Sequence, residues 1–184
     1  MYGVDDIAGF LKRSTTSESS EVTPYLLDPV DSVQCNTLGV AKHEVARVDE
    51  AVAYYGTDIT FPGGKVHLRC GSLGFGYIHI RNEHEAHWRD KYVSLGFPAN
   101  SALWDDFMWF VVYNSLEAPE TIVQRPANGT LCYTTPVVMM VNDMPTETFY
   151  PSVSIAPAEP TSTVPARKVP RVITAFPGGA CGYY

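Results

Sequence analysis

The sequence has few charged residues, and those it has are unbalanced toward acid. Only 18% of its 184 residues are Asp, Glu, Lys or Arg, and 13 Lys and Arg against 20 Asp and Glu give a formal net charge of −7. General affinity for nucleic acid comes from clustered basic side chains, so this balance excludes a protein that coats nucleic acid indiscriminately. A local basic site on an acidic body remains compatible with it.

The sequence also lacks a long apolar run. The longest covers residues 107–113, whereas a membrane-spanning helix needs about 18 or more apolar residues. We therefore expect no membrane-spanning segment. Hydrophobic residues nevertheless make up 45% of the chain and aromatic residues 12%, which is enough for a folded core and excludes a disordered chain.

The four cysteines, Cys35, Cys70, Cys132 and Cys181, are far apart, and no two of them have C-x-x-C spacing. Zinc ribbons need such close ligand pairs, so the spacing does not favour a zinc ribbon. Two interpretations stay open: four buried thiols, or two disulfides in one of the connectivities that four cysteines allow. Disulfides form in oxidising compartments, and the composition favours a secreted protein.

The N-terminal part of the chain differs in composition from the rest. Residues 13–24 are polar and rich in Ser and Thr, which is typical of a linker, and a short helix is expected over 4–11. Residues 25–33 are expected to be extended and irregular. The sequence therefore predicts an N-terminal extension and linker over residues 1–41 and a folded domain over 42–184.

The pattern of the folded domain predicts the α+β class. Apolar residues at helical spacing predict an amphipathic helix over 42–55, ended by Gly56, and a second helix over 102–116. The proline-rich segment 157–170 is expected to be a loop. Strands are expected over 58–61, 65–70, 131–141, 148–155 and 171–176. We expect N-terminal helices packed on a twisted antiparallel sheet.

Histidines are concentrated in one stretch, which is rich in charge and to which the pattern assigns neither a helix nor a strand. His67, His79, His84 and His87 fall within 21 residues. Histidine is the side chain best suited to proton transfer near neutral pH, so these are candidate general acids and bases, with a structural role as the alternative. The pair His84 and His87 is one residue short of the H-E-x-x-H spacing, which gives a metal-dependent hydrolase as a further hypothesis.

Basic residues gather near the C-terminus, where Arg167, Lys168 and Arg171 lead into an apolar segment that contains Thr174. From composition alone Thr174 is a strand threonine, favoured by β propensity. Its alternative is a hydroxyl that donates a hydrogen bond to a phosphate oxygen.

Three blocks of the sequence, in this order, resemble the toxin domains of bacterial contact-dependent and polymorphic toxin systems. The blocks are residues 70–84 with the pattern H-I-x-x-x-H, residues 104–108, and residues 171–177. Such domains belong to the barnase/EndoU/colicin/RelE-like group of ribonucleases, and the resemblance covers roughly residues 56–177. It implies a compact helix-plus-sheet fold of that group, metal-independent RNA cleavage without a cofactor, and a cognate immunity protein.

The resemblance also implies residue roles. By position, His79 and His84 form the acid–base pair and Thr174 supplies the hydroxyl, with Arg81 as a phosphate partner beside them. RNA carries its own nucleophile, the 2′-OH, so the reaction needs neither a metal nor a covalent intermediate. A base takes the 2′-OH proton and an acid protonates the leaving 5′-oxygen. The sequence does not separate the acid from the base.

Further side chains are candidates for binding the RNA. Lys168 and Arg171 would hold phosphate, and Tyr77, Tyr133 and Trp88 would stack on a base, with core packing as the alternative for these rings. We expect a monomeric endoribonuclease toxin acting on an RNA such as tRNA, either secreted or delivered into the cytoplasm of a target cell. The competing hypothesis is a disulfide-stapled secreted binding module without catalytic activity.

Overall fold

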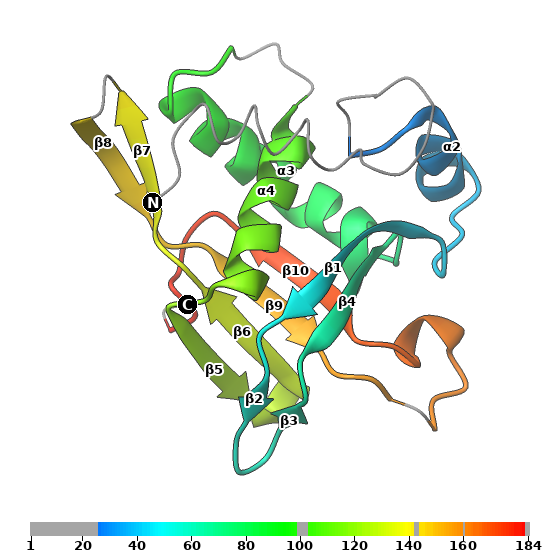
Figure 1. The fold of residues 1–184 in the computed structure, drawn as a ribbon. Helices are drawn as coiled ribbons and strands as arrows, with labels where there is room; N and C mark the ends of the chain where they lie inside the picture. The colour runs from blue at the N-terminus through cyan, green and yellow to red at the C-terminus, as the bar shows by residue number, and fades with distance from the viewer. Residues whose placement is uncertain (1–25, 99–102, 142–143, 160, 183–184) are drawn as a thin grey trace.

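The computed structural model describes residues 26–98, 103–141, 144–159 and 161–182 (Figure 1). The helix predicted over 4–11 and the linker predicted over 13–24 lie outside the described residues. The described residues form an α+β fold, as predicted, built on a six-stranded sheet.

The elements follow one another along the chain as α2 (Pro29–Ser32), a π-helical turn (Val33–Thr37), β1 (Glu44–Ala51), β2 (Tyr54–Tyr55), β3 (Thr60–Phe61), β4 (Gly64–Arg69), α3 (Gly76–Ser94), α4 (Trp104–Glu117), β5 (Thr121–Arg125), a 3-10 turn (Pro126–Asn128), β6 (Thr130–Thr134), β7 (Val137–Val141), β8 (Met144–Phe149), β9 (Ser152–Ala156), a second 3-10 turn (Pro165–Arg167) and β10 (Arg171–Phe176). Among the described residues, no helix combines the length and the apolarity that crossing a bilayer requires.

The six-stranded sheet has the order β1-β4-β10-β9-β6-β5. Adjacent strands in this sheet run antiparallel, except that β4 and β10 are parallel. These two strands share one registered pair, Arg171 with His67. The sheet is therefore mixed, and the expectation of a wholly antiparallel sheet is wrong at this pair. The strands β2 and β3, and β7 and β8, form separate two-stranded ribbons.

The helix predicted over 42–55 is wrong, because this segment forms strand β1. Val48 and Ala51 are both buried, at a spacing that resembles one turn of a helix. Their partners on β4, Val66 and Gly64, are only two residues apart, since the register shifts between the two pairs. Such an irregularity adds one residue to a strand and produces a spacing of three without a helix.

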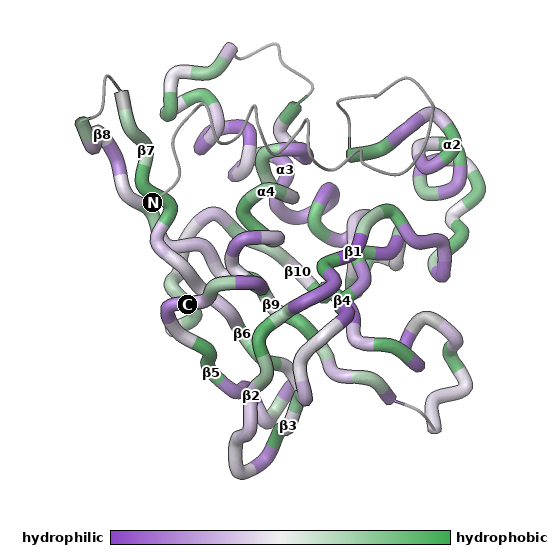
Figure 2. The backbone as a smooth tube through the Cα atoms, viewed as in Figure 1, coloured by the Kyte–Doolittle hydropathy of each residue, from purple (hydrophilic) through white to green (hydrophobic). Residues whose placement is uncertain are grey.

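Helix α3 covers the histidine-rich stretch, where the sequence predicted no helix. It begins at Gly76, whose φ is +79°. A Cβ added there would lie 2.6 Å from the carbonyl oxygen of Arg69, so the close approach of the chain to β4 requires glycine. Only a narrow stripe of the helix is apolar, with Ile80 and Trp88 fully buried. Figure 2 accordingly shows mainly hydrophilic residues along α3.

Helix α4 confirms the helix predicted over 102–116, although residue 102 itself lies outside the described residues. It is apolar around most of its circumference, and Figure 2 shows it as mainly hydrophobic. Phe107, Met108 and Leu116 are at most 1% exposed. The ring of Trp88 on α3 lies edge-on against Phe107, with 5.8 Å between centroids. The two helices thus pack together on one face of the sheet, as a helix buried on all sides requires.

The C-terminal strands are confirmed with different boundaries. The segment predicted over 131–141 divides at Pro136 into β6 and β7, and the segment predicted over 148–155 divides at Pro151 into β8 and β9. Proline has no backbone N–H to donate to a strand ladder. Strand β10 has the predicted bounds, the proline-rich loop is a loop apart from one 3-10 turn, and β5 was not predicted.

Two disulfides join Cys35 to Cys70 and Cys132 to Cys181, so the cysteines are not free thiols. The first bond ties the segment 26–41 to the loop before α3. Within that segment, residues 29–32 form the short helix α2 rather than the expected irregular chain. Asp28 caps this helix, since its side chain accepts a hydrogen bond from the Asp31 backbone at 2.7 Å.

Candidate active site

Three of the clustered histidines lie together on helix α3. The ring centroid of His84 is 5.7 Å from that of His79 and 5.8 Å from that of His87. His67 is separate: it lies on β4, and its Nδ1 contacts the carboxylate of Glu44. The structure therefore brings together His79 and His84, the predicted acid–base pair, and adds His87 to them.

The histidine cluster, His79, His84 and His87, meets the end of strand β10. The ring of Phe176 lies 5.4 Å from His84 and 5.0 Å from His87. Thr174 precedes Phe176 by two residues in a regular part of the strand, so both side chains are on the same side of it. The predicted hydroxyl donor is therefore two residues along β10 from the ring that contacts the histidines, on the same side of the strand.

The environment of His84 favours the neutral form of its imidazole. Burial is the main cause that lowers the pKa of His84, and the neighbouring His79 and His87 lower it further. Its Nδ1 is buried and has no hydrogen-bond partner among the described residues. A neutral imidazole with a nitrogen available is the form that accepts a proton.

His79 is oriented by a backbone contact. Its Nδ1 lies 2.8 Å from the carbonyl oxygen of Leu73 in the turn before α3. A carbonyl oxygen only accepts, so Nδ1 of His79 carries the proton in this contact. In the neutral imidazole the other nitrogen, Nε2, is then the one without a proton.

Thr174 carries a second buried polar atom that lacks a partner. Its Oγ1 has no hydrogen-bond partner within the part of the chain that the structure describes. Buried polar atoms are nearly always hydrogen-bonded, so each exception calls for an explanation. His84 Nδ1 on α3 and Thr174 Oγ1 on β10 are two such atoms, and each is available to a ligand or a water molecule.

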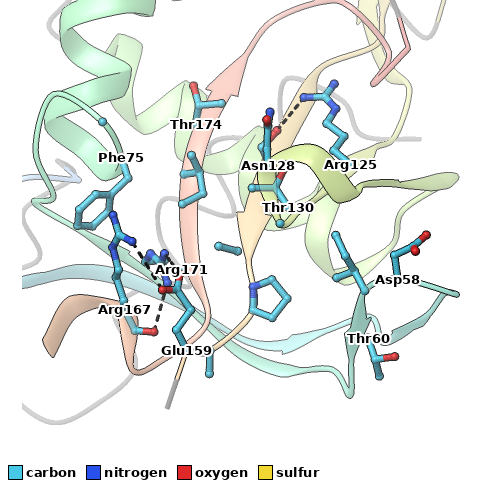
Figure 3. Close-up of a pocket in the computed structure, with 18 residues that line it drawn as sticks. Asp58, Thr60, Phe75, Arg125, Asn128, Thr130, Glu159, Arg167, Arg171 and Thr174 are labelled. Atoms are coloured by element: carbon cyan, nitrogen blue, oxygen red, sulfur yellow. Dashed lines mark hydrogen bonds and ion pairs between the residues drawn. The ribbon is translucent and has the colours of Figure 1, made fainter. Parts of the chain in front are cut away.

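A cleft of about 690 Å³ opens beside Thr174 (Figure 3). Ser154 and Thr130 line it, whereas the alternate residues of their strands, such as Ile155 and Leu131, are in the core with the helices. The cleft therefore lies on the sheet face opposite α3 and α4. Gly74 and Phe75, the turn that leads into α3, form one wall.

Three arginines and two carboxylates line this cleft: Arg125, Arg167, Arg171, Asp58 and Glu159. Arg171 has a 5% exposed side chain and forms an ion pair with Glu159 at 2.6 Å. The hydrogen bond from Arg171 is the main cause that lowers the pKa of Glu159. Arg171 thus reaches the predicted place but is already bound to a carboxylate.

Lys168 is exposed and does not line the cleft. Arg125, which does line it, was not among the predicted site residues. Its strand, β5, was itself not predicted, and nothing else in the sequence indicated that this side chain reaches the sheet face beside Thr174.

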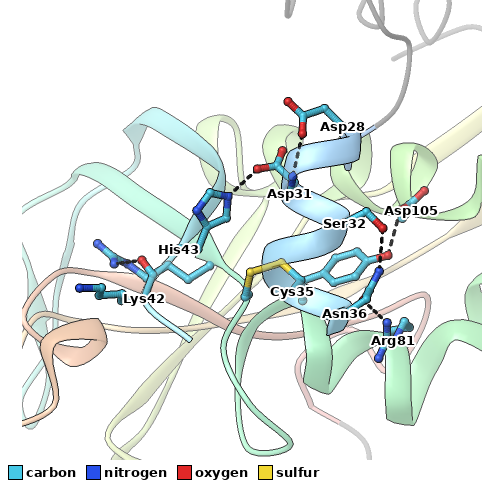
Figure 4. Close-up of a disulfide and its surroundings, with 12 residues drawn as sticks. Asp28, Asp31, Ser32, Cys35, Asn36, Lys42, His43, Arg81 and Asp105 are labelled. Atoms are coloured by element: carbon cyan, nitrogen blue, oxygen red, sulfur yellow. Dashed lines mark hydrogen bonds and ion pairs between the residues drawn. A yellow bond between two sulfur atoms is a disulfide. The ribbon is translucent and has the colours of Figure 1, made fainter. Parts of the chain in front are cut away.

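Arg81 does not join the histidine cluster. Successive residues of an α-helix are about 100° apart, so Arg81 and His79 are about 200° apart around α3 and lie on different sides of it. The Arg81 guanidinium donates to the side-chain oxygen of Asn36 in the N-terminal segment (Figure 4). The structure therefore does not support Arg81 as a phosphate partner beside the histidines.

The predicted stacking rings are inside the core. Tyr77 is 3% exposed and donates to Asp105 at 3.1 Å, and Tyr133 is fully buried and donates to the Val52 carbonyl oxygen at 2.8 Å. Trp88 is fully buried as well, and its Nε1 donates to the Ala175 carbonyl oxygen at 3.0 Å. A nucleobase cannot reach these rings, and the core-packing alternative is the one observed.

Within the described ranges, no three His, Cys, Asp or Glu side chains are arranged to hold a metal ion. Comparison of the chain with protein-family models, with curated proteins and with solved structures finds no match in any of the three. Since a fold class does not determine an activity, the function has to be inferred from the site.

Proposed function

We propose that this protein is a metal-independent endoribonuclease that cleaves RNA by transesterification. The observation that carries the proposal is the junction of α3 and β10. There the ring of Phe176 contacts His84, which lies beside two further histidines and whose buried Nδ1 has no partner among the described residues. Thr174, two residues from Phe176 on the same side of β10, has a buried hydroxyl that likewise lacks a described partner. Paired imidazoles and a hydroxyl donor are the groups that this reaction uses.

In this proposal His84 is the base, because burial and the neighbouring histidines lower its pKa and favour the neutral form that accepts a proton. His84 takes the proton from the 2′-OH, the 2′-oxygen forms a bond to phosphorus, and the bond from phosphorus to the 5′-oxygen breaks. A protonated His79 gives its Nε2 proton to that oxygen, since its Nδ1 is bound to Leu73. The products are a 2′,3′-cyclic phosphate and a free 5′-OH, so protons and bonds balance.

Thr174 stabilises the charge that develops on the phosphate. Its hydroxyl needs a partner, and a nonbridging phosphate oxygen supplies one as negative charge accumulates in the transition state. A positioned donor of this kind contributes about 3 kcal/mol to lowering the barrier. The positive charge of the cleft arginines acts in the same direction, on a protein whose net charge is −7.

The resemblance to bacterial toxin domains supports placing this activity in a delivered toxin. Two disulfides suit a protein that passes through an oxidising compartment. We propose that such a protein acts as a monomer on an RNA such as tRNA in the cytoplasm of a target cell. A cognate immunity protein would neutralise it by covering the cleft.

The test is incubation of the purified protein with total RNA in EDTA, followed by analysis of the fragments and their ends. We expect discrete fragments that end in 2′,3′-cyclic phosphate, and we expect His84→Ala to abolish them. His67→Ala is the matched control, because His67 lies outside the histidine cluster. RNA that stays intact in all conditions, including added cell extract, would favour the disulfide-stapled binding module instead.

A further inference from the structure

We propose that the cleft is a binding site for a carboxylate group, and that the Glu159 side chain occupies this site on Arg171 until a ligand replaces it. The inference goes beyond the proposed function and does not rest on it, because the bound group is a carboxylate and not the phosphate of RNA. A small organic acid and an acidic side chain of another protein share this chemistry.

Arg171 is a buried cation in the wall of an open cleft. Its side chain is 5% exposed, and it lines the cleft together with Phe75, whose ring centroid is 5.7 Å from the guanidinium carbon. Nη2 of Arg171 donates to Oε1 of Glu159 at 2.6 Å, and Nη1 donates to the carbonyl oxygen of Arg167 at 3.3 Å. A buried charge is costly without a charge of opposite sign beside it, so an anion is needed at this position.

One donor of this guanidinium is not used by Glu159. A guanidinium presents two parallel N–H bonds, from Nε and from Nη2, to the two oxygens of a single carboxylate. Glu159 takes only Nη2, since its other oxygen, Oε2, pairs with Nη1 of Arg167 at 3.6 Å. Nε of Arg171 is buried and has no hydrogen-bond partner among the described residues. A carboxylate that binds Nε and Nη2 together therefore makes one hydrogen bond to Arg171 more than Glu159 makes.

The Glu159 side chain can leave Arg171 without displacing the loop that carries it. It is 43% exposed and lies in the connection between β9 and β10, outside both strands. An ion pair of an exposed carboxylate is weak, because water competes for the carboxylate. The backbone N–H of Glu159 donates to the carbonyl oxygen of Arg167 at 2.8 Å, which holds the loop while the side chain turns outward.

The group that Glu159 supplies identifies the class of ligand. Exchange of one carboxylate for another leaves the charge in contact with Arg171 unchanged, whereas a doubly charged phosphate would alter it. Figure 3 shows Glu159 between Arg167 and Arg171, with Phe75 beside them. The lining also includes Ile173, and the cleft volume of about 690 Å³ is much larger than a carboxylate, so there is room for the organic group that carries it.

Calorimetric titration of the purified protein at neutral pH measures this binding. The probes are N-acetylglycine, a small acid with one carboxylate, a blocked alanine peptide with one central glutamate, and inorganic phosphate. Glu159→Gln removes the competing charge with almost no change in size. The matched control is Glu147→Gln, because Glu147 also forms an ion pair, with Lys91 at 2.7 Å, but does not line the cleft.

We expect Glu159→Gln to bind a carboxylate probe at least about tenfold more tightly than the wild type, as follows when Glu159 occupies the site for about nine-tenths of the time or more. Glu147→Gln should match the wild type. Arg171→Lys, added to Glu159→Gln, keeps the charge but removes the paired donors, so the affinity should fall again by about tenfold. Thermal unfolding confirms that each variant is folded.

The two carboxylate probes separate the two sources of the ligand. Tighter binding of N-acetylglycine identifies a small acid, and tighter binding of the peptide identifies an acidic segment of a partner protein. Equal affinity of the wild type and Glu159→Gln for both probes, or no binding of either, would overturn the inference and leave the ion pair as an anchor of the loop. Tighter binding of inorganic phosphate than of either carboxylate would overturn the class of ligand. None of these results depends on RNA cleavage, so the ribonuclease proposal and the carboxylate site fail separately.

Discussion

Replacement of Asp106 by Asn should remove a pH dependence from the stability of the protein. Asp106 lies in the first turn of α4, 4% exposed, and accepts a hydrogen bond from the Leu26 backbone. Burial raises its pKa from an ordinary 3.8 to about 7, and the adjacent Asp105 adds to the increase. The folded protein thus retains a proton that the unfolded chain releases.

The direction in which the free energy of unfolding changes with pH follows from proton linkage. Because the pKa of Asp106 is higher in the folded protein than in the unfolded chain, its bound proton stabilises the fold. This stabilisation is complete below pH 3.8, the ordinary pKa, and is lost as the pH rises to about 7, the pKa in the folded protein. At about 1.4 kcal/mol per pH unit, the loss is about 4 kcal/mol over that range. Asparagine stays neutral throughout and can still accept from Leu26. The free energy of unfolding of Asp106→Asn minus that of the wild type should therefore be about 4 kcal/mol larger at pH 8 than at pH 4.

Urea unfolding followed by tryptophan fluorescence at one-unit pH intervals measures this difference. Asp58→Asn is the control, because Asp58 is an exposed carboxylate in the loop before β3. Parallel pH profiles for the wild type and Asp106→Asn would refute the reasoning. The second oxygen of Asp106, Oδ2, has no partner among the described residues, so its replacement by an amide nitrogen adds a cost that does not change with pH.

Further expected outcomes concern the site and the turn before α3. His84→Ala should lower the rate of RNA cleavage at least about 100-fold, whereas His67→Ala should not, as measured with a labelled oligonucleotide. With His84 as base, kcat/KM should fall as the pH drops through its lowered pKa, which places the acidic limb of the profile below pH 6.5; a limb above that value would contradict the assignment. Thr174→Val should lower the rate about 100-fold with little change in melting temperature, because the hydroxyl has no hydrogen bond to lose among the described residues. Gly76→Ala should lower the melting temperature, since its Cβ would meet the Arg69 carbonyl oxygen at 2.6 Å; an unchanged melting curve would contradict the close approach.

Elements with a strong local pattern could be predicted from the sequence. Helix α4 is apolar enough to show its periodicity, and β10 is a short β-branched run bounded by prolines. Strand β1 was misassigned because its register shift mimics a helical spacing. Helix α3 was missed because its apolar stripe is narrow and polar side chains occupy the rest of its surface.

The candidate site was predicted in part. The histidines are neighbours in sequence, so their contacts follow from the helix that carries them, and the resemblance pointed to Thr174. The position of Arg81 depends on which way α3 faces, and that is set by tertiary packing. The place of Arg125 depends on the pairing of β5 with β6 and of β6 with β9, which no local pattern encodes.

The two disulfides also divide the sheet into separately cross-linked parts. One closes a loop of chain that contains β1 and β4, and the other closes a loop that contains β9 and β10. The loops do not interleave, so either can oxidise during folding without constraining the other. Among the described residues, the two parts of the sheet are joined by the pair His67 and Arg171, where the His67 N–H donates to the Pro170 carbonyl oxygen at 3.0 Å. The pairing of β4 with β10 is the least extensive pairing of the described sheet, so local opening along it breaks the fewest backbone hydrogen bonds and leaves both disulfide-closed loops intact.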